Sequence, residues 1–371
     1  MIYLDYAANT PVDPRVLQTY CDVTTEYAAN PNSTHPLGLR AKAYLDQCTE
    51  EIAQLLGVLP EEIIYTSGAS ESNNLAIKGA AGQYKKYGRH IVTTMLEHSS
   101  VNGAVGYLES LGFEVDYADI TPDGLVDLDS LKVLLRDDTI LVSVCAVDSE
   151  IGLKQDIGKI AEIVKGLPHC LFHVDATQAV GKIPLCLDKV DLVTFAPHKF
   201  YGPNGCGVLI KKAPMLLEPL IHGGISTTPF RSGTPALPLI AAMQRALSLT
   251  FSEMDTRYDE VSSLNHRLRE AFSGYKGITV NSTTNAVPFI LNISLPGVKT
   301  EEFAQALAEK EIYLSTKSAC CAPNTVSRPV YALTKNKKAA LSTLRISLSH
   351  LTTQSDVESF LTCFDRIYKS L

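Results

Sequence analysis

Seven short apolar segments, each bounded by turn-forming residues, constrain the fold of this 371-residue chain more than any other feature. They are EIIYTS (62–67), HIVTT (90–94), FEVDYAD (113–119), ILVSVCAV (140–147), CLFHVDA (170–176), DLVTFA (191–196) and CGVLI (206–210). Most intervals between them show helical periodicity, for example at Ala76, Ile77, Ala80 and Ala81 and again at Ile157, Ile160, Ala161 and Val164. Because several segments are almost continuously apolar, they are typical of strands covered on both faces. We therefore predict an α/β fold with one large, mostly parallel, seven-stranded sheet.

The pattern changes after about residue 255. Helical periodicity then dominates and alternates with short apolar runs such as VPFILNISL (287–295). The helical positions include Leu264, Leu268, Ala271 and Phe272, and later Val357, Phe360, Leu361, Phe364, Ile367 and Tyr368. We predict a large domain over 15–255 and a smaller α+β domain formed by 1–14 and 256–371.

Composition excludes several classes of function. Hydrophobic residues make up 45% and charged residues 20%, which is typical of a soluble globular protein. The net charge of −7 argues against direct nucleic-acid binding, and no apolar run approaches the length of a membrane span. The start, MIYLDYAANTPVDP, lacks the features of an export signal, so the nine scattered cysteines are expected to be reduced in a cytoplasmic protein. No CxxC or HExxH spacing supports a metal site.

In open α/β sheets, ligands bind where strands end and helices begin, so we examined those positions for chemistry. The segment GASESNN follows the first apolar segment, and Gly68 allows a tight turn there. Ser70 is then placed to bind a phosphate at a helix N-terminus, or alternatively only to cap that helix. In HVDATQAVGK, Asp175 ends an apolar strand and Gln178 follows it. Asp175 can pair with a buried cation or cap a following helix.

Lys199 lies between two apolar segments, in APHKFYGPNGCG, where prolines and glycines fix the backbone. A lysine desolvated at a strand end can form an imine, whereas the simpler alternative is a surface lysine in a loop. A phosphate-binding turn, a carboxylate for a ring nitrogen and an imine-forming lysine are together what pyridoxal 5'-phosphate (PLP) requires.

The chain resembles the cysteine desulfurases of the NifS/IscS type, members of the class V aminotransferase family with the PLP fold type I. The matching motifs are YLDYAANTPVDP (3–14), ANPNSTHPLG (29–38), TSGASESNNLAIKG (66–79), TMLEHSS (94–100), SEIGLKQDI (149–157), HVDATQAVGKIPL (173–185), HKFYGPNGCG (198–207), HGG (222–224), FRSGT (230–234), KSACCA (317–322) and STLRISLS (342–349). This resemblance covers essentially the whole chain.

The resemblance implies a role for each residue around the cofactor. Lys199 would carry PLP, with His198 beside its phosphate. Asp175 would pair with the ring nitrogen, and Gln178 would donate to the phenolic oxygen. His98 would stack on the ring and take part in proton transfers, although the simpler alternative is a polar histidine in a helix-start turn.

The phosphate site shows both matches and departures. Ala69 and Ser70 would form its turn, with Ser70 where threonine is usual. Thr234 would reach the phosphate of a neighbouring subunit, which implies a homodimer. Ala196 stands where the family has a phosphate-binding serine, and Pro197 stands where glycine is common. These departures predict a weakened phosphate site.

The resemblance also implies a substrate site for L-cysteine. Arg345 would bind the substrate carboxylate, because a guanidinium fork fits a carboxylate; the alternative is an arginine in a surface ion pair. Asn30 and His35 would line the same opening. Ser149 stands near the substrate, where asparagine is usual.

The segment KSACCAPN points to desulfuration, because PLP enzymes in general need no cysteine there. Cys320 would attack the substrate sulfur, leaving a persulfide on the enzyme and releasing alanine. Cys321, where a small hydroxyl residue is frequent, would be an apolar filler or a second thiol. Lys317 would assist ionisation of the nucleophile or be a surface lysine.

We therefore expect a cytoplasmic, homodimeric, PLP-dependent cysteine desulfurase that passes sulfur to an acceptor protein. Both iron–sulfur cluster assembly and a tRNA-thiolation relay are possible destinations, and the sequence does not choose between them. The alternatives are a selenocysteine lyase, another class V PLP enzyme, or a non-catalytic protein that keeps only the fold.

Overall fold

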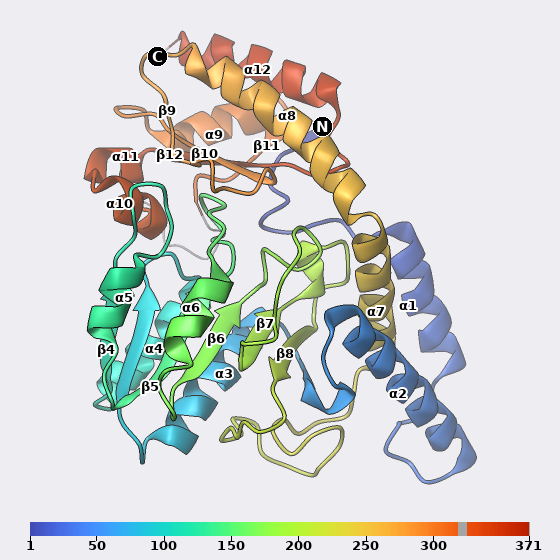
Figure 1. Cartoon of the computed structure of the whole chain (residues 1–371). Coiled ribbons are helices and arrows are strands. Elements are labelled where there is room, and N and C mark those ends of the chain that lie inside the picture. The colour runs from blue at the N-terminus through green and yellow to red at the C-terminus, as the bar shows by residue number, and fades with distance from the viewer. Residues whose placement is uncertain (318–324, 371) are drawn as a thin grey trace.

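The computed structural model describes residues 1–317 and 325–370, and a seven-stranded sheet forms its largest layer (Figure 1). The strands are β2 (Ile63–Thr66), β3 (His90–Thr94), β4 (Glu114–Ala118), β5 (Thr139–Cys145), β6 (Leu171–Asp175), β7 (Leu192–Phe195) and β8 (Gly207–Lys211). Their order is β2-β8-β7-β6-β5-β3-β4. β8 runs antiparallel to β2 and β7, and the other pairs are parallel. Each predicted apolar segment coincides with one strand, although β5 begins one residue before its segment and β8 ends one residue after its segment. The predicted mostly parallel sheet is therefore confirmed.

Helices cover both faces of this sheet, because alternate residues of a strand point to opposite sides. On one face, Leu192 and Leu209 belong to a buried cluster with residues of α3 and α4. On the other face, Val193 and Val208 belong to a cluster that includes residues of α6 and α7. The helices of this part are α1 (Pro14–Glu26), α2 (Pro36–Leu56), α3 (Ala69–Tyr84), α4 (Ser99–Ser110), α5 (Leu128–Leu134), α6 (Ile157–Val164) and α7 (Leu237–Ser252), with short 3-10 helices η1 (Pro60–Glu62) and η2 (Pro197–Lys199).

Two smaller sheets and further helices lie above the large sheet in Figure 1. The strands β9 (Thr279–Val280), β10 (Ile290–Ser294) and β12 (Thr343–Ser347) are antiparallel, and β1 (Ile2–Tyr3) pairs in parallel with β11 (Ile312–Tyr313). The helices are α8 (Met254–Ser273), α9 (Thr300–Ala308), α10 (Arg328–Thr334), α11 (Lys337–Leu341) and α12 (Gln354–Tyr368). This confirms the smaller α+β part, whereas the boundaries 1–14, 15–255 and 256–371 stay a prediction.

Local sequence signals set several helix ends. Asp13 caps α1 and accepts a hydrogen bond from the backbone N–H two residues on, and Pro14 occupies the first helical position. α2 ends at Gly57, whose φ of 65° lies in the left-handed region that glycine adopts without strain. Thr353 and Asp356 form a reciprocal capping box at the start of α12. These ends depend on residues within the same few positions, so the sequence alone specifies them.

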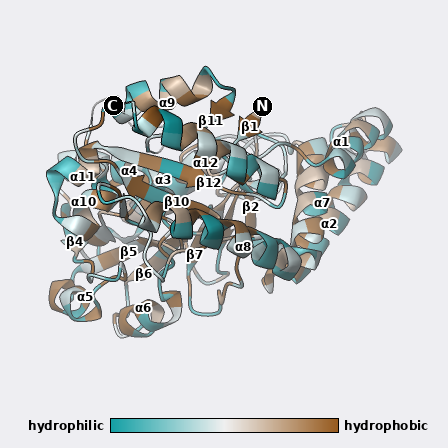
Figure 2. Cartoon of the chain, turned by 90° about the horizontal axis from the view of Figure 1, so that it is seen from above, coloured by the Kyte–Doolittle hydropathy of each residue, from teal (hydrophilic) through white to brown (hydrophobic). Residues whose placement is uncertain are grey.

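Figure 2 views the molecule from above and shows α1, α2 and α7 gathered on one side, where α7 packs against both of the others. Their position leaves the upper edge of the large sheet open toward the smaller sheets in Figure 1. No helix within the described ranges combines the length and the apolar character that crossing a bilayer requires.

Strand β8 approaches the turn before α3 unusually closely, and Gly207 makes this approach possible. A Cβ atom on Gly207 would lie 2.5 Å from the carbonyl carbon of Gly68 and 2.6 Å from its Cα. Because both neighbours are backbone atoms, no side-chain rotation relieves the contact. The absence of a side chain therefore fixes the position of the turn that leads into α3.

Gly207→Ala is expected to destabilise the protein by about 1–3 kcal/mol, because either β8 or the preceding turn of α3 has to move. Gly103→Ala is the matched control, since a Cβ on Gly103 in α4 would have no heavy atom within 4 Å. Because alanine has a greater helix propensity than glycine, Gly103→Ala should raise the free energy of unfolding by up to about 1 kcal/mol. Urea denaturation measures both changes, and a Gly207→Ala variant as stable as the wild type would contradict the close contact.

Candidate active site

A cavity of about 340 Å³ lies where the ends of strands of the large sheet meet β12 of the smaller part. Its wall brings together residues that are far apart in the sequence, from Ala7 to Arg345. The predicted site residues that line it are Ala69, Ser70, His98, Ser149, Asp175, Gln178, His198, Lys199 and Arg345. The structure thus gathers most of the predicted residues in one place, while their chemical roles stay predictions.

Lys199 ends the 3-10 helix η2, and a tight turn fixes its position. The N–H of Gly202 donates to the carbonyl oxygen of Pro197 at 2.8 Å, and a Cβ on Gly202 would lie 2.4 Å from the Cβ of Pro197. The Nζ of Lys199 donates to the carbonyl oxygens of Ala7 and Ala8 at 2.8 and 2.5 Å. Lys199 is therefore held in the cavity wall, and the surface-loop alternative is wrong.

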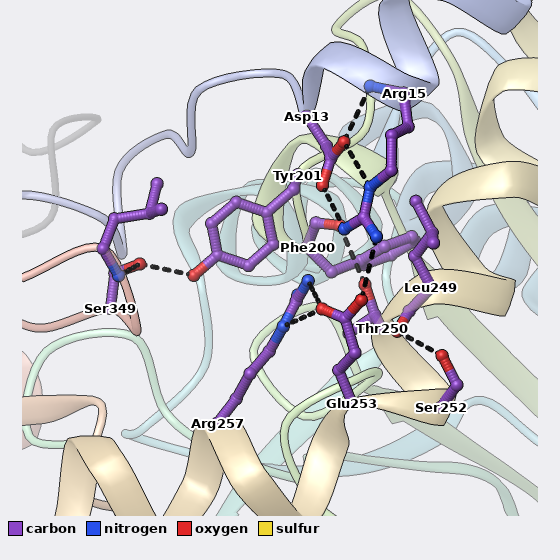
Figure 3. Close-up of polar contacts among 11 residues, drawn as sticks. Asp13, Arg15, Phe200, Tyr201, Leu249, Thr250, Ser252, Glu253, Arg257 and Ser349 are labelled. Carbon is purple, nitrogen blue, oxygen red and sulfur yellow. Dashed lines mark hydrogen bonds and ion pairs between the residues drawn. The ribbon is translucent and has the colours of Figure 1, made fainter.

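Tyr201 belongs to the same turn, and several side chains fix its position (Figure 3). Its φ of 68° is left-handed, a conformation that is strained for a side chain of this size. Its N–H donates to Oγ1 of Thr10 at 2.8 Å, and its hydroxyl shares a 2.7 Å hydrogen bond with Ser349. The guanidinium of Arg257 lies 4.8 Å from the ring centroid and pairs with Glu253 at 2.6 Å. These contacts from three segments keep the strained residue in place.

Asp175 stands at the end of β6 with both carboxylate oxygens hydrogen-bonded. Its Oδ2 accepts from the side-chain amide of Asn73 at 2.8 Å, and its Oδ1 accepts from the N–H of Thr177 at 3.0 Å. The residues after it form turns and no helix up to β7, so the helix-cap alternative is wrong. The carboxylate is fixed at the cavity wall, where it can pair with a positively charged ring nitrogen.

The proposed phosphate turn lies at the start of α3. The helix begins at Ala69 with Gly68 as its N-cap, so Ser70 is in the first turn and does not cap the helix. Ala69, Ser70 and Glu71 all line the cavity, and Glu71 pairs with Arg231 at 2.9 Å. The positive end of a 16-residue helix therefore faces the cavity, which favours an anion.

The histidines of the site are in their neutral form near pH 7. His98 caps α4 by accepting from the N–H of Ser100 at 3.2 Å, and burial lowers the pKa of His98. His98 therefore caps a helix and also lines the cavity, while its stacking on the ring and its role in proton transfer stay predictions. Burial lowers the pKa of His198 to about 4. A neutral imidazole can donate one proton and accept another, as proton transfer requires.

Arg345 lies in β12 with 1% of its surface exposed, so the surface-pair alternative is wrong. Its Nη2 pairs with Oδ1 of Asp5 at 2.8 Å, and its Nη1 donates to the carbonyl oxygen of Ser149 at 2.9 Å. Its buried Nε has no hydrogen-bond partner within the described residues. Asp5 and Ser149 therefore orient the guanidinium, and Nε remains to bind an anion.

The residues present fit PLP. The hydroxyl of Thr177 is buried in the cavity wall and has no partner within the described ranges, so a donor is available to an anionic oxygen. Lys199, Asp175 and the start of α3 supply the other groups that PLP chemistry needs. The cavity volume of about 340 Å³ is also within the range of small-molecule sites.

Several predicted residues lie outside this cavity. Asn30 and Thr234 are exposed, and His35 caps α2 through Nδ1, which accepts the N–H of Gly38. None of them lines the cavity of its own chain. Ala196 is fully buried and does not line the cavity either, so its effect on phosphate binding stays a prediction.

The predicted nucleophile Cys320 and its neighbour Cys321 lie outside the described residues. Lys317, just before them, donates through Nζ to the carbonyl oxygen and the hydroxyl of Thr325 at 3.0 and 3.1 Å. With 8% of its surface exposed, Lys317 is not the surface lysine of the simpler alternative.

Sequence reasoning missed several residues that shape the site. Asn73 follows Ala69 by about one helical turn on α3, a spacing that could have identified it. Glu97 accepts from the N–H of Cys145 at 2.9 Å and so ties the turn before His98 to β5. Asp5 had no local signal, because its partner is 340 residues away.

His173 gives a test of the electrostatics beneath Asp175. It is fully buried between the hydroxyls of Ser143 and Thr194, and burial lowers its pKa to about 4. The unfolded pKa is near 6.5, so unfolding takes up a proton between these values, and His173 costs stability as the pH falls through this window. As the pH falls from 6.5 to 4, the free energy of unfolding of His173→Gln should therefore rise relative to that of the wild type by up to about 1.4 kcal/mol per pH unit. Urea denaturation across this range measures the difference; a difference independent of pH would contradict the assignment.

Comparisons with known proteins agree with the geometry. The family model described as "Aminotransferase class-V" matches residues 2–360. "Cysteine desulfurase IscS" of Vibrio atlanticus is 40% identical over 96% of this chain and 90% of its own length, and a "NifS/IcsS protein homolog" of Lactobacillus delbrueckii subsp. bulgaricus is 38% identical over 100% and 97%. Among solved structures, a "NIFS-like protein" matches 100% of both chains with a TM-score of 0.93 and 34% identity. "SspA in complex with cysteine" matches 95% of this chain and 100% of its own with a TM-score of 0.83 and 32% identity. The chain belongs to the class V aminotransferases, a PLP-dependent enzyme family, and within it to the homologues of the cysteine desulfurases IscS and NifS.

Proposed function

We propose that this enzyme removes sulfur from L-cysteine, giving L-alanine and a persulfide on Cys320 that is passed to an acceptor. The observation that carries this proposal is the convergence of Lys199, Asp175 and Arg345 on one cavity, with the guanidinium Nε of Arg345 unpartnered among the described residues. An amine, an acid and an anion-binding donor are the groups needed to bind PLP and an amino acid together. The similarity to cysteine desulfurases narrows the amino acid to cysteine.

The cofactor-binding groups are assigned as follows. Bound PLP supplies an electron sink that stabilises the electron pair left when the substrate loses its α-proton. Lys199 holds the cofactor covalently, and Asp175 keeps the ring nitrogen protonated. The start of α3 at Ala69 and Ser70 binds the phosphate.

The protein's own groups then act on the substrate. Arg345 binds the substrate carboxylate, since Asp5 and the carbonyl oxygen of Ser149 hold its guanidinium in position. The substrate amine first takes the place of Lys199 on the cofactor; the freed Lys199 amine then accepts the α-proton, and neutral His98, which lines the same cavity, moves a second proton. The Cys320 thiolate attacks the substrate sulfur, so that an S–S bond forms as the C–S bond breaks. The electron pair of the C–S bond goes to the β-carbon; protonation of that carbon and return of a proton to the α-carbon yield alanine, which leaves as the Lys199 amine takes back its covalent position.

A homodimer is part of this proposal. Thr234 is exposed and lies outside its own cavity, as a residue that serves a neighbouring subunit would. Nearby apolar side chains are exposed too, including Ile221 at 42% and Ile225 at 80%. Burial of such side chains in a subunit interface would stabilise the dimer. The surface formed by the described residues does not choose between an iron–sulfur assembly acceptor and a tRNA-thiolation relay, and the cytoplasmic location stays a prediction.

Lys199→Ala should abolish the visible absorption band of bound PLP and alanine release, because no other amine takes the covalent position. Lys159→Ala is the control, since Lys159 is a surface residue paired with Asp156. It should keep both the band and full activity. A Lys199→Ala enzyme that retains the band and turns over cysteine would refute the assignment. Selenocysteine as an alternative substrate, compared by alanine release, distinguishes a lyase for that amino acid from a desulfurase.

The two adjacent cysteines provide a matched pair of variants. Cys320→Ser should lose nearly all alanine production while keeping the PLP band, because only the nucleophile is removed. Cys321→Ser should keep more than about half of the activity, because the resemblance assigns the nucleophilic role to Cys320 alone. Mass spectrometry after one turnover should find the additional sulfur on Cys320, and a label mainly on Cys321 would reverse the assignment.

A further inference from the structure

Lys182 is a buried lysine that the proposed reaction does not use. It lies in the turn after β6, with 8% of its surface exposed. Its Nζ donates to Oε1 of Gln178 at 2.7 Å and lies 6.0 Å from the centroid of the Phe289 ring. Within the described residues, no carboxylate forms an ion pair with it. Burying an ammonium that is held by one neutral oxygen lowers the free energy of unfolding, so we looked for a function of Lys182 that offsets this loss of stability.

Gln178 connects Lys182 with the catalytic lysine. Its Nε2 donates to the carbonyl oxygen of Ala7 at 2.9 Å, and the same oxygen accepts from Nζ of Lys199 at 2.8 Å. The two ends of the amide thus face different partners. Its oxygen faces Lys182, whereas its NH₂ group lies on the cavity side, beside Lys199.

The direction of this amide depends on Lys182. A lysine ammonium has three donors and no acceptor, so a flipped amide would place two donors against each other. The flip would also aim the Gln178 oxygen at the carbonyl oxygen of Ala7. Lys182 therefore selects the orientation in which a donor is presented next to Lys199.

The charged and titratable groups around Lys182 come from several elements. Lys199 of η2, Arg257 of α8, Tyr201 and Tyr6 line a small cavity together with it, and Arg345 of β12 acts on it electrostatically. Burial, together with the charges of Lys199 and Arg345, lowers the pKa of Lys182 to about 7. The charge of Lys182 accordingly varies near neutral pH, whereas an N–H donor toward Gln178 is present in both forms.

We propose that Lys182 is a positioning residue of the cofactor site, which holds the Gln178 amide with its NH₂ toward the oxygen that PLP carries next to the carbon bound by Lys199. This inference rests on the proposed function, since it assumes PLP in the cavity. It assigns to Lys182 a contribution to PLP affinity that acts entirely through Gln178.

A double-mutant cycle with PLP as the probe tests the proposal. Lys182→Met removes the donor and keeps the length of the side chain; it should weaken PLP binding by about tenfold and shift the absorption maximum of bound PLP. Lys182→Arg keeps a donor and should stay within about threefold of the wild type. In a Gln178→Leu background, Lys182→Met should change the dissociation constant by less than about twofold, because the residue through which it acts is gone.

Lys211→Met is the matched control. Lys211 is also buried, but its Nζ donates to backbone carbonyls at the end of β8, away from the cavity. It should lower the melting temperature and leave the PLP dissociation constant unchanged. Should Lys182→Met fail to fold, Lys182→Gln takes its place with the same expected loss, since its amide is too short to reach Gln178.

Equal losses of PLP affinity in the wild-type and Gln178→Leu backgrounds would overturn the proposal, as would unchanged affinity in Lys182→Met. These outcomes are separate from a failure of the proposed function. A wild-type enzyme that binds PLP and releases no alanine from cysteine would refute the desulfurase assignment and leave the PLP comparison valid.

Discussion

The hydrogen bonds accepted by the carbonyl oxygen of Ala7 are the interactions on which the site depends most. It accepts hydrogen bonds from Lys199 and Gln178, while the N–H of Ala7 donates to Ser347 in β12. Asp5, two residues earlier, pairs with Arg345. A single short segment, which turns at residues 6–8, thus supplies acceptors for the amine, the amide and the guanidinium. Because it contacts both the large sheet's ligand edge and the smaller sheet, it sets the distance between the cofactor groups and the substrate arginine.

Several cationic side chains lie in the interior around this segment, and the groups that offset their charges explain much of the local geometry. Lys182 and Arg257 lie beside Lys199 in a small neighbouring cavity, Arg345 lines the main cavity, and the imidazole of His198 stays neutral. In a low-dielectric interior, like charges repel one another strongly, so each cation makes it less favourable for its neighbours to stay charged. Backbone carbonyls and two carboxylates, Asp5 and Glu253, offset that cost. The remaining positive potential is suited to a cofactor and a substrate that both carry negative charge.

The sequence predicted the large sheet well, because strand and helix periodicities are local and each apolar segment is bounded by turn formers. Asp175 and Lys199 could be predicted to belong to the same site, since the ends of neighbouring strands in such a sheet lie close together. Ser70 shows the limit of the local view: the sequence allowed it to be a helix cap, but the helix begins one residue earlier, at Ala69. Asp5 and Lys182 were missed for different reasons. The partner of Asp5 is 340 residues away, and the contact of Lys182 depends on the irregular turn after β6.

The route of the first residues has a consequence for biosynthesis. Asp5 and Ala7 leave the ribosome early, yet their partners Ser347 and Arg345 belong to the last strand of the chain. The large sheet, with Asp175 and Lys199, can form while the rest is still being made, since domains generally fold as units during synthesis. The amino-terminal segment can contact Lys199 and Gln178 as soon as these residues have been made, but its contacts with Ser347 and Arg345 require β12. The amine and the arginine are therefore joined into one site only after β12 has been synthesised.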